Sequence, residues 1–179
     1  MQALKGRMRL RGEYEVIKLR AMPRWMPRSI WLWMWRHGLL NSLVISRSGK
    51  ISNLIMLGTN TGLNLLVQHL HGTTTFPLVI DNASIGTGTT TPTGADTDLE
   101  TPVLENIVRA IGELQGVDTL YTEWFITDDE LTNGTYNEFG LFCGAQIFCR
   151  SIISPAHVKG SGEDTLIPYT IIADNGEES

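Results

Sequence analysis

The stretch IGTGTTTPTGADTDLETPV, residues 85–103, has the glycine and threonine content of a phosphate-binding loop. A nucleoside-triphosphate loop needs GxxxxGK followed by Ser or Thr, and this stretch has no lysine. A dinucleotide-binding turn needs GxGxxG, but Gly86 and Gly88 are followed by Thr91 at the third glycine position. Acids that would repel an anion follow at Asp96, Asp98 and Glu100. We therefore expect a connection between packed elements and no bound cofactor.

The residues that commonly hold metals do not have metal-site spacings. Cys143 and Cys149 are the only cysteines, whereas a structural zinc site normally takes four ligands in short pairs and a redox centre favours CxxC. We expect buried free thiols in adjacent strands, with a disulfide across a hairpin as the alternative. The acids Asp128, Asp129 and Glu130 lack the calcium-loop spacing. We expect a solvated acidic turn there and no metal.

Catalytic motifs are also missing from the sequence. It contains neither the GxSxG of a nucleophile elbow nor HExxH, and neither cysteine has a histidine partner in a recognisable context. The histidines are scattered at His37, His69, His71 and His157. A carboxylate pair for glycoside cleavage depends on spatial distances that a sequence does not give. We expect no catalytic residue and no enzyme activity.

Four tryptophans within 11 residues form the most unusual cluster of side chains, in the segment AMPRWMPRSIWLWMWRHG. Pro23 and Pro27 are expected to block a helix, so we predict an extended segment with Trp31, Trp33 and Trp35 on one face and apolar residues on the other. Such a strand must be covered on both sides. Core of the same domain, a subunit interface and a sugar-stacking platform are the three interpretations.

The interface interpretation assigns a docking role to six side chains. Tryptophan and arginine are enriched at protein contacts, where aromatic burial contributes most of the affinity and exposed ion pairs contribute little. Arginines at the rim would pair with carboxylates of a neighbour and set the register of docking. The predicted interface residues are Trp25, Arg28, Trp31, Trp33, Trp35 and Arg36.

Charge is unevenly distributed along the 179 residues. Residues 1–50 hold 11 Lys and Arg against two acids, a balance of +9, and the remainder holds three against 17, a balance of −14. A basic segment of this kind meets either nucleic acid or the acidic face of a neighbouring copy. Because the chain carries its own acidic surface, we favour self-assembly and expect no nucleic acid, with a solvated basic edge strand as the alternative.

The remaining pattern indicates a β-rich protein. Short apolar or alternating runs are separated by turn residues and lie at 7–20, with a break at Gly12, and at 43–46, 50–57, 76–88, 106–115, 119–127, 138–144, 146–153 and 165–173. One short helix is expected at about 61–71, with an apolar stripe of Leu63, Leu66, Val67 and Leu70 and an end at Gly72. We predict a mainly β fold, an antiparallel β-sandwich or partial barrel with an extended N-terminal arm. The division is a basic, Trp-rich arm or hairpin at 1–50 and an acidic domain at 51–179.

No apolar run approaches the roughly 20 residues that cross a bilayer. The basic N-terminal residues are not followed by an apolar block and a cleavage site, so a secretory signal is not expected. We expect a soluble protein that is made and folded in a cytoplasm.

Several motifs, in order along the chain, resemble those of small virion proteins of tailed bacteriophages. Proteins of this kind carry an Asn-x-Gly-Leu helix, an IGTGTTxP loop with a following TxLE segment, an NExGLF strand and a closing DTLxxxYxI strand. The matching residues are 60–63, 85–92, 97–100, 137–142 and 164–171, and the similarity covers 53–173, about two-thirds of the chain. Residues 1–50 have no counterpart in the pattern.

The resemblance implies a structural role in the tail, collar or baseplate and fibre region of a virion. It implies that the Gly/Thr/Pro run is a structural crossover without a cofactor, and that the partners are other virion proteins and copies of the same chain. A virion protein of this kind is made in the host cytoplasm. A receptor-binding or carbohydrate-binding fibre module, which would contact a host surface glycan, is the alternative function.

Overall fold

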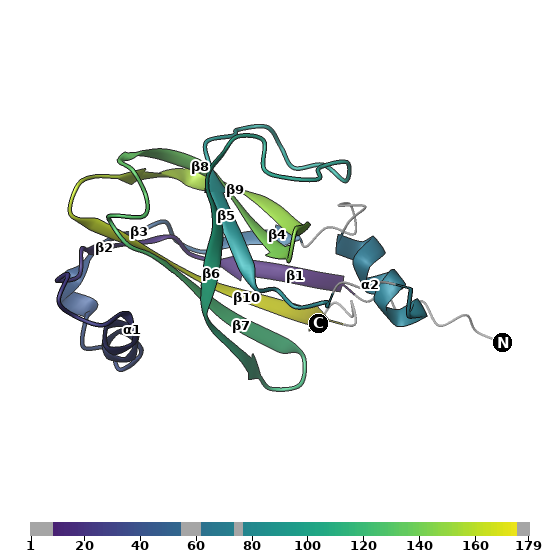
Figure 1. Ribbon diagram of the computed structural model, residues 1–179, viewed down its shortest axis with the longest axis horizontal. Coiled ribbons are helices and arrows are strands. Elements are labelled where there is room, and N and C mark those ends of the chain that lie inside the picture. Colours follow the sequence, from purple (N-terminus) through teal and green to yellow (C-terminus); the bar gives the residue numbers. More distant parts are fainter. Residues whose placement is uncertain (1–8, 55–61, 74–76, 175–179) are drawn as a thin grey trace.

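The computed structural model describes residues 9–54, 62–73 and 77–174, and the elements in those ranges are mainly strands (Figure 1). In chain order they are β1 (Arg9–Tyr14), β2 (Ile17–Arg20), α1 (Arg28–Arg36), a short 3-10 turn (Asn41–Leu43), β3 (Val44–Arg47), β4 (Ile51–Leu54), α2 (Gly62–His71), β5 (Asn82–Gly86), β6 (Pro102–Gln115), β7 (Thr119–Ile126), β8 (Gly134–Cys143), β9 (Gln146–Lys159) and β10 (Glu163–Asp174).

The strands form one antiparallel sheet that curls into a half-barrel. Its order is β3-β2-β10-β7-β6-β5-β8-β9, and β1 also pairs with β10 and β4. β10 is long enough to pair with β2 through its first residues and with β1 through its last. The curl brings β1 against β9, where the hydroxyls of Tyr14 and Ser151 lie 2.6 Å apart. The predicted fold class, a mainly β antiparallel partial barrel, is confirmed.

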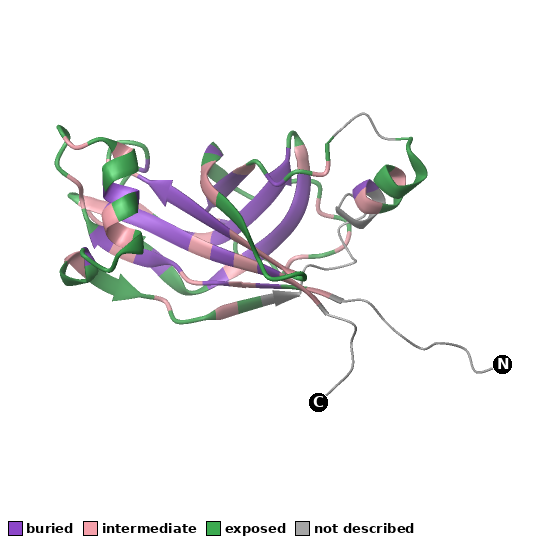
Figure 2. Ribbon diagram, turned by 90° about the horizontal axis from the view of Figure 1, so that it is seen from below, coloured by how far each residue is buried: buried purple, intermediate pink, exposed green. Residues whose placement is uncertain are grey.

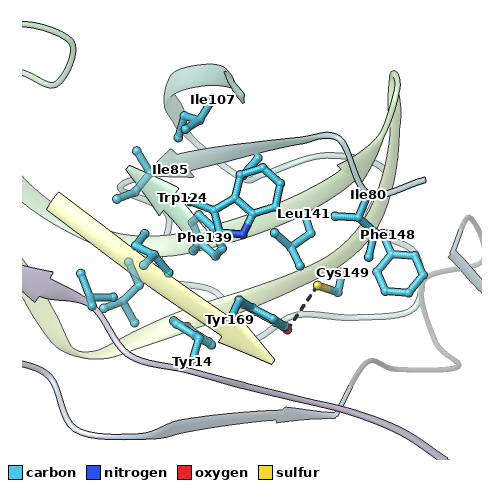
Figure 3. Packing of buried hydrophobic residues seen from close by; sticks show 14 of the residues in the cluster. Tyr14, Ile80, Ile85, Ile107, Trp124, Phe139, Leu141, Phe148, Cys149 and Tyr169 are labelled. Carbon is cyan, nitrogen blue, oxygen red and sulfur yellow. Dashed lines mark hydrogen bonds between the residues drawn. The ribbon is translucent and has the colours of Figure 1, made fainter. Parts of the chain in front are cut away.

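Strand alternation builds two apolar clusters, one on each face of the sheet. On β7, Trp124 points into the larger cluster, where it packs with Phe139, Leu141 and Tyr169 (Figure 3). Phe125, the next residue, points the other way, into a smaller cluster that α1 covers. Because both faces of β7 are packed, its buried residues Trp124, Phe125 and Ile126 run consecutively.

The predicted helix at 61–71 is confirmed as α2, and Gly72 follows it with φ +75°. Its apolar stripe was predicted incorrectly. Leu65 is buried, whereas Val67 and Leu70 are exposed, so α2 packs through a different face. The side chain of Leu63 lies outside the described residues.

The N-terminal section differs from the extended arm that the sequence predicts. β1 and β2 are hydrogen-bonded to β10, and β3 is hydrogen-bonded to β2, so residues 9–47 include three strands of the sheet. Their apolar residues supply the reason, since Tyr14 and Val16 are buried in the larger cluster and Leu19 in the smaller. Residues 1–8 lie outside the described residues.

Candidate docking surface

The tryptophan segment is a helix and not the extended strand predicted from its sequence. Pro27 is the N-cap residue and Pro23 precedes the helix, so neither proline removes a hydrogen bond from the helix interior. At the other end, Gly38 adopts φ +70°, its N–H donates to Trp35 O, and the N–H of Leu39 donates to Met34 O. α1 is therefore capped at its C-terminal end by backbone bonds that need glycine.

The helix separates the predicted interface tryptophans. Trp31 is 2% exposed and packs against Phe125 of the sheet, with 6.5 Å between ring centroids. Trp35, one turn later, is half-buried and lies beneath the guanidinium of Arg47. Trp33 points the other way and is 54% exposed. Trp31 is thus a core residue, and the prediction that the three rings share one face is wrong because the segment has helical periodicity.

The exposed apolar residues of this segment define the α1 surface. They lie on α1 and in the loops on either side of it, and Figure 2 shows exposed residues on α1 away from the sheet. Trp25, in the loop before the helix, is 79% exposed. The α1 surface consists of Trp25, Ile30, Trp33 and Leu39. Large apolar residues gathered in one exposed segment are typical of a docking site.

The arginines around the α1 surface are paired with carboxylates of the same chain. Arg36 lies 2.8 Å from Glu113, and Arg24 lies 2.7 Å from Asp129. Arg24 and Asp129 are exposed, so the pair adds little to stability.

Arg28 joins α1 to the sheet by three contacts. It pairs with Glu130 at 3.5 Å, donates to the carbonyl oxygen of Phe125 and lies over the Phe125 ring. Arg28 therefore ties α1 to its own sheet, and Arg24, Arg28 and Arg36 each have a carboxylate partner within the chain.

A buried ion-pair network organises the 87–101 loop, which overlaps the crossover motifs at 85–92 and 97–100. Oε1 of Glu138 accepts hydrogen bonds from the N–H groups of Gly88 and Thr101, at 2.9 and 2.7 Å. Its Oε2 accepts from the N–H of Glu100 and from Nε of Arg150, at 3.0 and 2.8 Å. Burial opposes ionisation of Glu138, but these four donors outweigh it and hold its pKa below the usual range.

Arg150 extends the same network outward. Its Nη1 lies 2.8 Å from Asp96 Oδ2, and its Nη2 donates to Thr90 Oγ1 and Glu100 Oε2 at 3.3 Å. The side chain of Arg150 is only 2% exposed. Sequence reasoning missed Glu138 and Arg150, although each is a charged residue within an apolar strand run, which indicates a buried pair. Their hydrogen bonds are used inside the chain, and the loop is held as a structural crossover.

A second buried cation ties two turns together. Lys159 Nζ lies 2.6 Å from Asp128 Oδ1, and Asp128 Oδ2 accepts a hydrogen bond from the N–H of Gly162. Asp164 accepts hydrogen bonds from the N–H groups of Met22 and Asp128 at the wall of a pocket of about 290 Å³. Within the described ranges no group of His, Cys, Asp or Glu residues is arranged to hold a metal ion. Asp128 is therefore a structural partner of Lys159, whereas Asp129 and Glu130 are exposed, as expected of a solvated acidic turn.

The two cysteines are free and buried, as expected. Burial raises the pKa of the Cys143 thiol to about 12, and the Cys149 thiol, which lies 3.5 Å from the Tyr169 hydroxyl, has its pKa raised by burial to about 11 (Figure 3). Both thiols therefore pack within the larger apolar cluster. His69 and His71 are exposed at the end of α2.

Comparison with protein-family models, with curated proteins and with solved structures found no match. Neither helix of the described residues has the length and apolar character to cross a membrane.

Proposed function

We propose that this chain is a non-enzymatic structural subunit that assembles with copies of itself, and with other proteins of the same particle, through the α1 surface. The motif order of residues 53–173 supports a place in the tail, collar or baseplate region of a tailed-bacteriophage virion, with synthesis in the host cytoplasm. The observation that carries the docking role is the exposure of Trp25 and Trp33 on a segment fixed to the sheet.

The support for docking is the combination of exposed rings and a rigid base. Trp31 and Arg28 hold α1 on the sheet, so Trp33 is presented without a large loss of conformational entropy on binding. Each tryptophan buried at a protein contact contributes roughly 2 to 4 kcal/mol, whereas an exposed ion pair contributes about 0 to 1 kcal/mol. Aromatic burial therefore sets the affinity of the assembly, and the paired arginines have a minor part.

Sedimentation velocity over a concentration series tests the proposal. Trp33→Ala is expected to shift the monomer to assembly transition to higher concentration, whereas Leu114→Ala leaves it unchanged. Leu114 is the matched control, because it is an exposed leucine at the β6–β7 end, 79% exposed. Equal transitions in the two variants would contradict a role for the α1 surface.

A carbohydrate-binding fibre module is the second candidate, and the exposure of Trp25 favours it. Stacking on a sugar needs an open ring face, and Trp25 is 79% exposed. This function predicts binding of the chain to a glycan array, loss of that binding in Trp25→Ala, and no change in sedimentation. Nucleic acid is not proposed as a partner, because Arg24, Arg28 and Arg36 are paired within the chain.

A further inference from the structure

A carboxylate with an incomplete set of partners is buried on the face of the sheet that α1 covers. Glu123 lies on β7, two residues before Phe125, and strand alternation directs both side chains to the face that α1 covers. Glu123 is 2% exposed. Its Oε1 accepts a hydrogen bond from the Tyr121 hydroxyl at 2.6 Å, and its Oε2 has no partner.

The layer between α1 and the sheet holds a second unsatisfied polar atom. Among the described residues, the buried side-chain nitrogen and oxygen atoms without a hydrogen-bond partner are Glu123 Oε2 and Trp31 Nε1. Trp31 is the buried anchor of α1 and packs against Phe125, so both atoms lie on the face of the sheet that α1 covers. An ionised carboxylate without full pairing is costly in such a place, whereas the neutral acid costs much less.

The charged groups on this face compensate for an anion at Glu123 only in part. Arg36, at the end of α1, is a cation that acts on Glu123, but it is already paired with Glu113 at 2.8 Å. Glu113 lies opposite Tyr121 in the β6–β7 register, so its charge opposes ionisation of Glu123.

On the other side of Glu123, β10 contributes no charge, since Pro168 is its partner there. Beyond Pro168 the face carries Glu13, Glu15 and Lys50. Lys50 pairs with Glu13, and Arg47 pairs with Glu15. The cations near this face are thus already engaged by other carboxylates.

From this geometry we infer that the packing of α1 on the sheet is pH-sensitive. The helix packs most firmly when Glu123 is protonated and packs less firmly when Glu123 is ionised. Burial raises the pKa of Glu123, although Tyr121 and Arg36 act in the opposite direction. When α1 is detached from the sheet, the Glu123 carboxylate is hydrated and has its ordinary pKa of about 4.3. The fraction of molecules in which α1 is packed on the sheet therefore falls as the pH rises from that value to the raised pKa, and is constant above it.

Hydrogen exchange of the α1 amides in the isolated chain tests this inference, independently of any assembly. After correction for the intrinsic exchange rate, protection of α1 is expected to fall by up to about tenfold per pH unit between the two pKa values. Glu123→Gln keeps the shape and an acceptor for Tyr121 but has no ionisable group, so its α1 protection is expected to be independent of pH.

A second variant keeps the test decisive if Glu123→Gln does not fold. Tyr121→Phe removes the donor that favours the carboxylate, so the loss of α1 protection is expected to continue to higher pH before it levels off. Glu113→Gln frees Arg36 to act on Glu123, so the loss is expected to level off at lower pH. Level protection in the natural chain, the same pH dependence in Glu123→Gln, or an unmoved transition in Tyr121→Phe would each overturn the inference.

Discussion

Nε of Arg150 on β9 lies 2.8 Å from Oε2 of Glu138 on β8, and both side chains are buried. The pair is diagonal in the strand register, since Arg150 lies opposite Gly140. Glu138 also accepts hydrogen bonds from Gly88 and Thr101 of the 87–101 loop, so the two strands and the loop share one network. The position of the 87–101 loop therefore depends on two residues outside it.

Removal of Arg150 is expected to destabilise the fold strongly. In Arg150→Met, Glu138 and Asp96 are left as acids without their cation, and breaking a buried pair in this way costs about 3 to 5 kcal/mol. Chemical denaturation measures the loss. Arg24→Met is the matched control and is expected to lose less than about 1 kcal/mol, because its pair with Asp129 is exposed. Similar losses in the two variants would show that the buried network does not stabilise the loop.

Stability is expected to fall in acid because of the same network. The folded-state pKa values of Glu138 and Asp96 are depressed: burial opposes this, but hydrogen bonds from backbone N–H groups and from Arg150 outweigh it. Their contribution is present above the ordinary pKa values of about 4 and is lost as the pH falls through the depressed ones. The free energy of unfolding, measured from pH 7 downward, is expected to decrease less steeply in Glu138→Gln. An identical slope would assign acid sensitivity to other carboxylates.

The glycines of the crossover are required by close packing. A Cβ on Gly88 would lie 2.5 Å from Glu138 Oε1 and 2.6 Å from Glu100. Gly88→Ala is therefore expected to cost about 1 to 3 kcal/mol, as overpacking does. Gly134→Ala is the control, because its Cβ would meet only ordinary contacts, the nearest at 3.5 Å. Thermal unfolding compares the two, and a Gly88→Ala protein as stable as the control would be inconsistent with this packing.

The thiols are expected to resist alkylation in the folded protein. Cys143 and Cys149 are both buried, and their raised pKa values keep them protonated at neutral pH. Iodoacetamide at pH 7.5 is expected to label neither until denaturant is added, and mass spectrometry of the intact chain reads out the labelling. Rapid modification of the native protein would show that the β8–β9 hairpin opens readily.

The β-strands were predictable because their signals are local. Short apolar runs separated by Gly, Asn and Asp correspond to β7, β8, β9 and β10, and a capped apolar run corresponds to α2. The pairing partners of β1 and β2 are not local. Their hydrogen bonds go to β10, more than 140 residues away, so the alternating sequence of the N-terminal section indicates a strand but not the strand with which it pairs.

The tryptophan segment was mispredicted for a physical reason. Residues at i and i+2 share a face in a strand but point apart in a helix, and Pro27 was treated as a helix breaker although it occupies the N-cap position. The interface prediction thus included Trp31, which is buried, together with Trp25 and Trp33, which are exposed. The Glu138–Arg150 pair depends on strand register, which the positions of charged residues alone do not determine.

Fluorine NMR of the chain labelled with fluorotryptophan tests the central claim, that the α1 surface contacts another molecule. The resonances are assigned by single Trp→Phe variants and followed over a concentration series in which sedimentation reports assembly. The resonances of exposed Trp25 and Trp33 are expected to shift or broaden on assembly, whereas that of Trp124, which is fully buried, stays in place. A chain that remains a monomer at every concentration, or that assembles with Trp25 and Trp33 unchanged, would contradict the account.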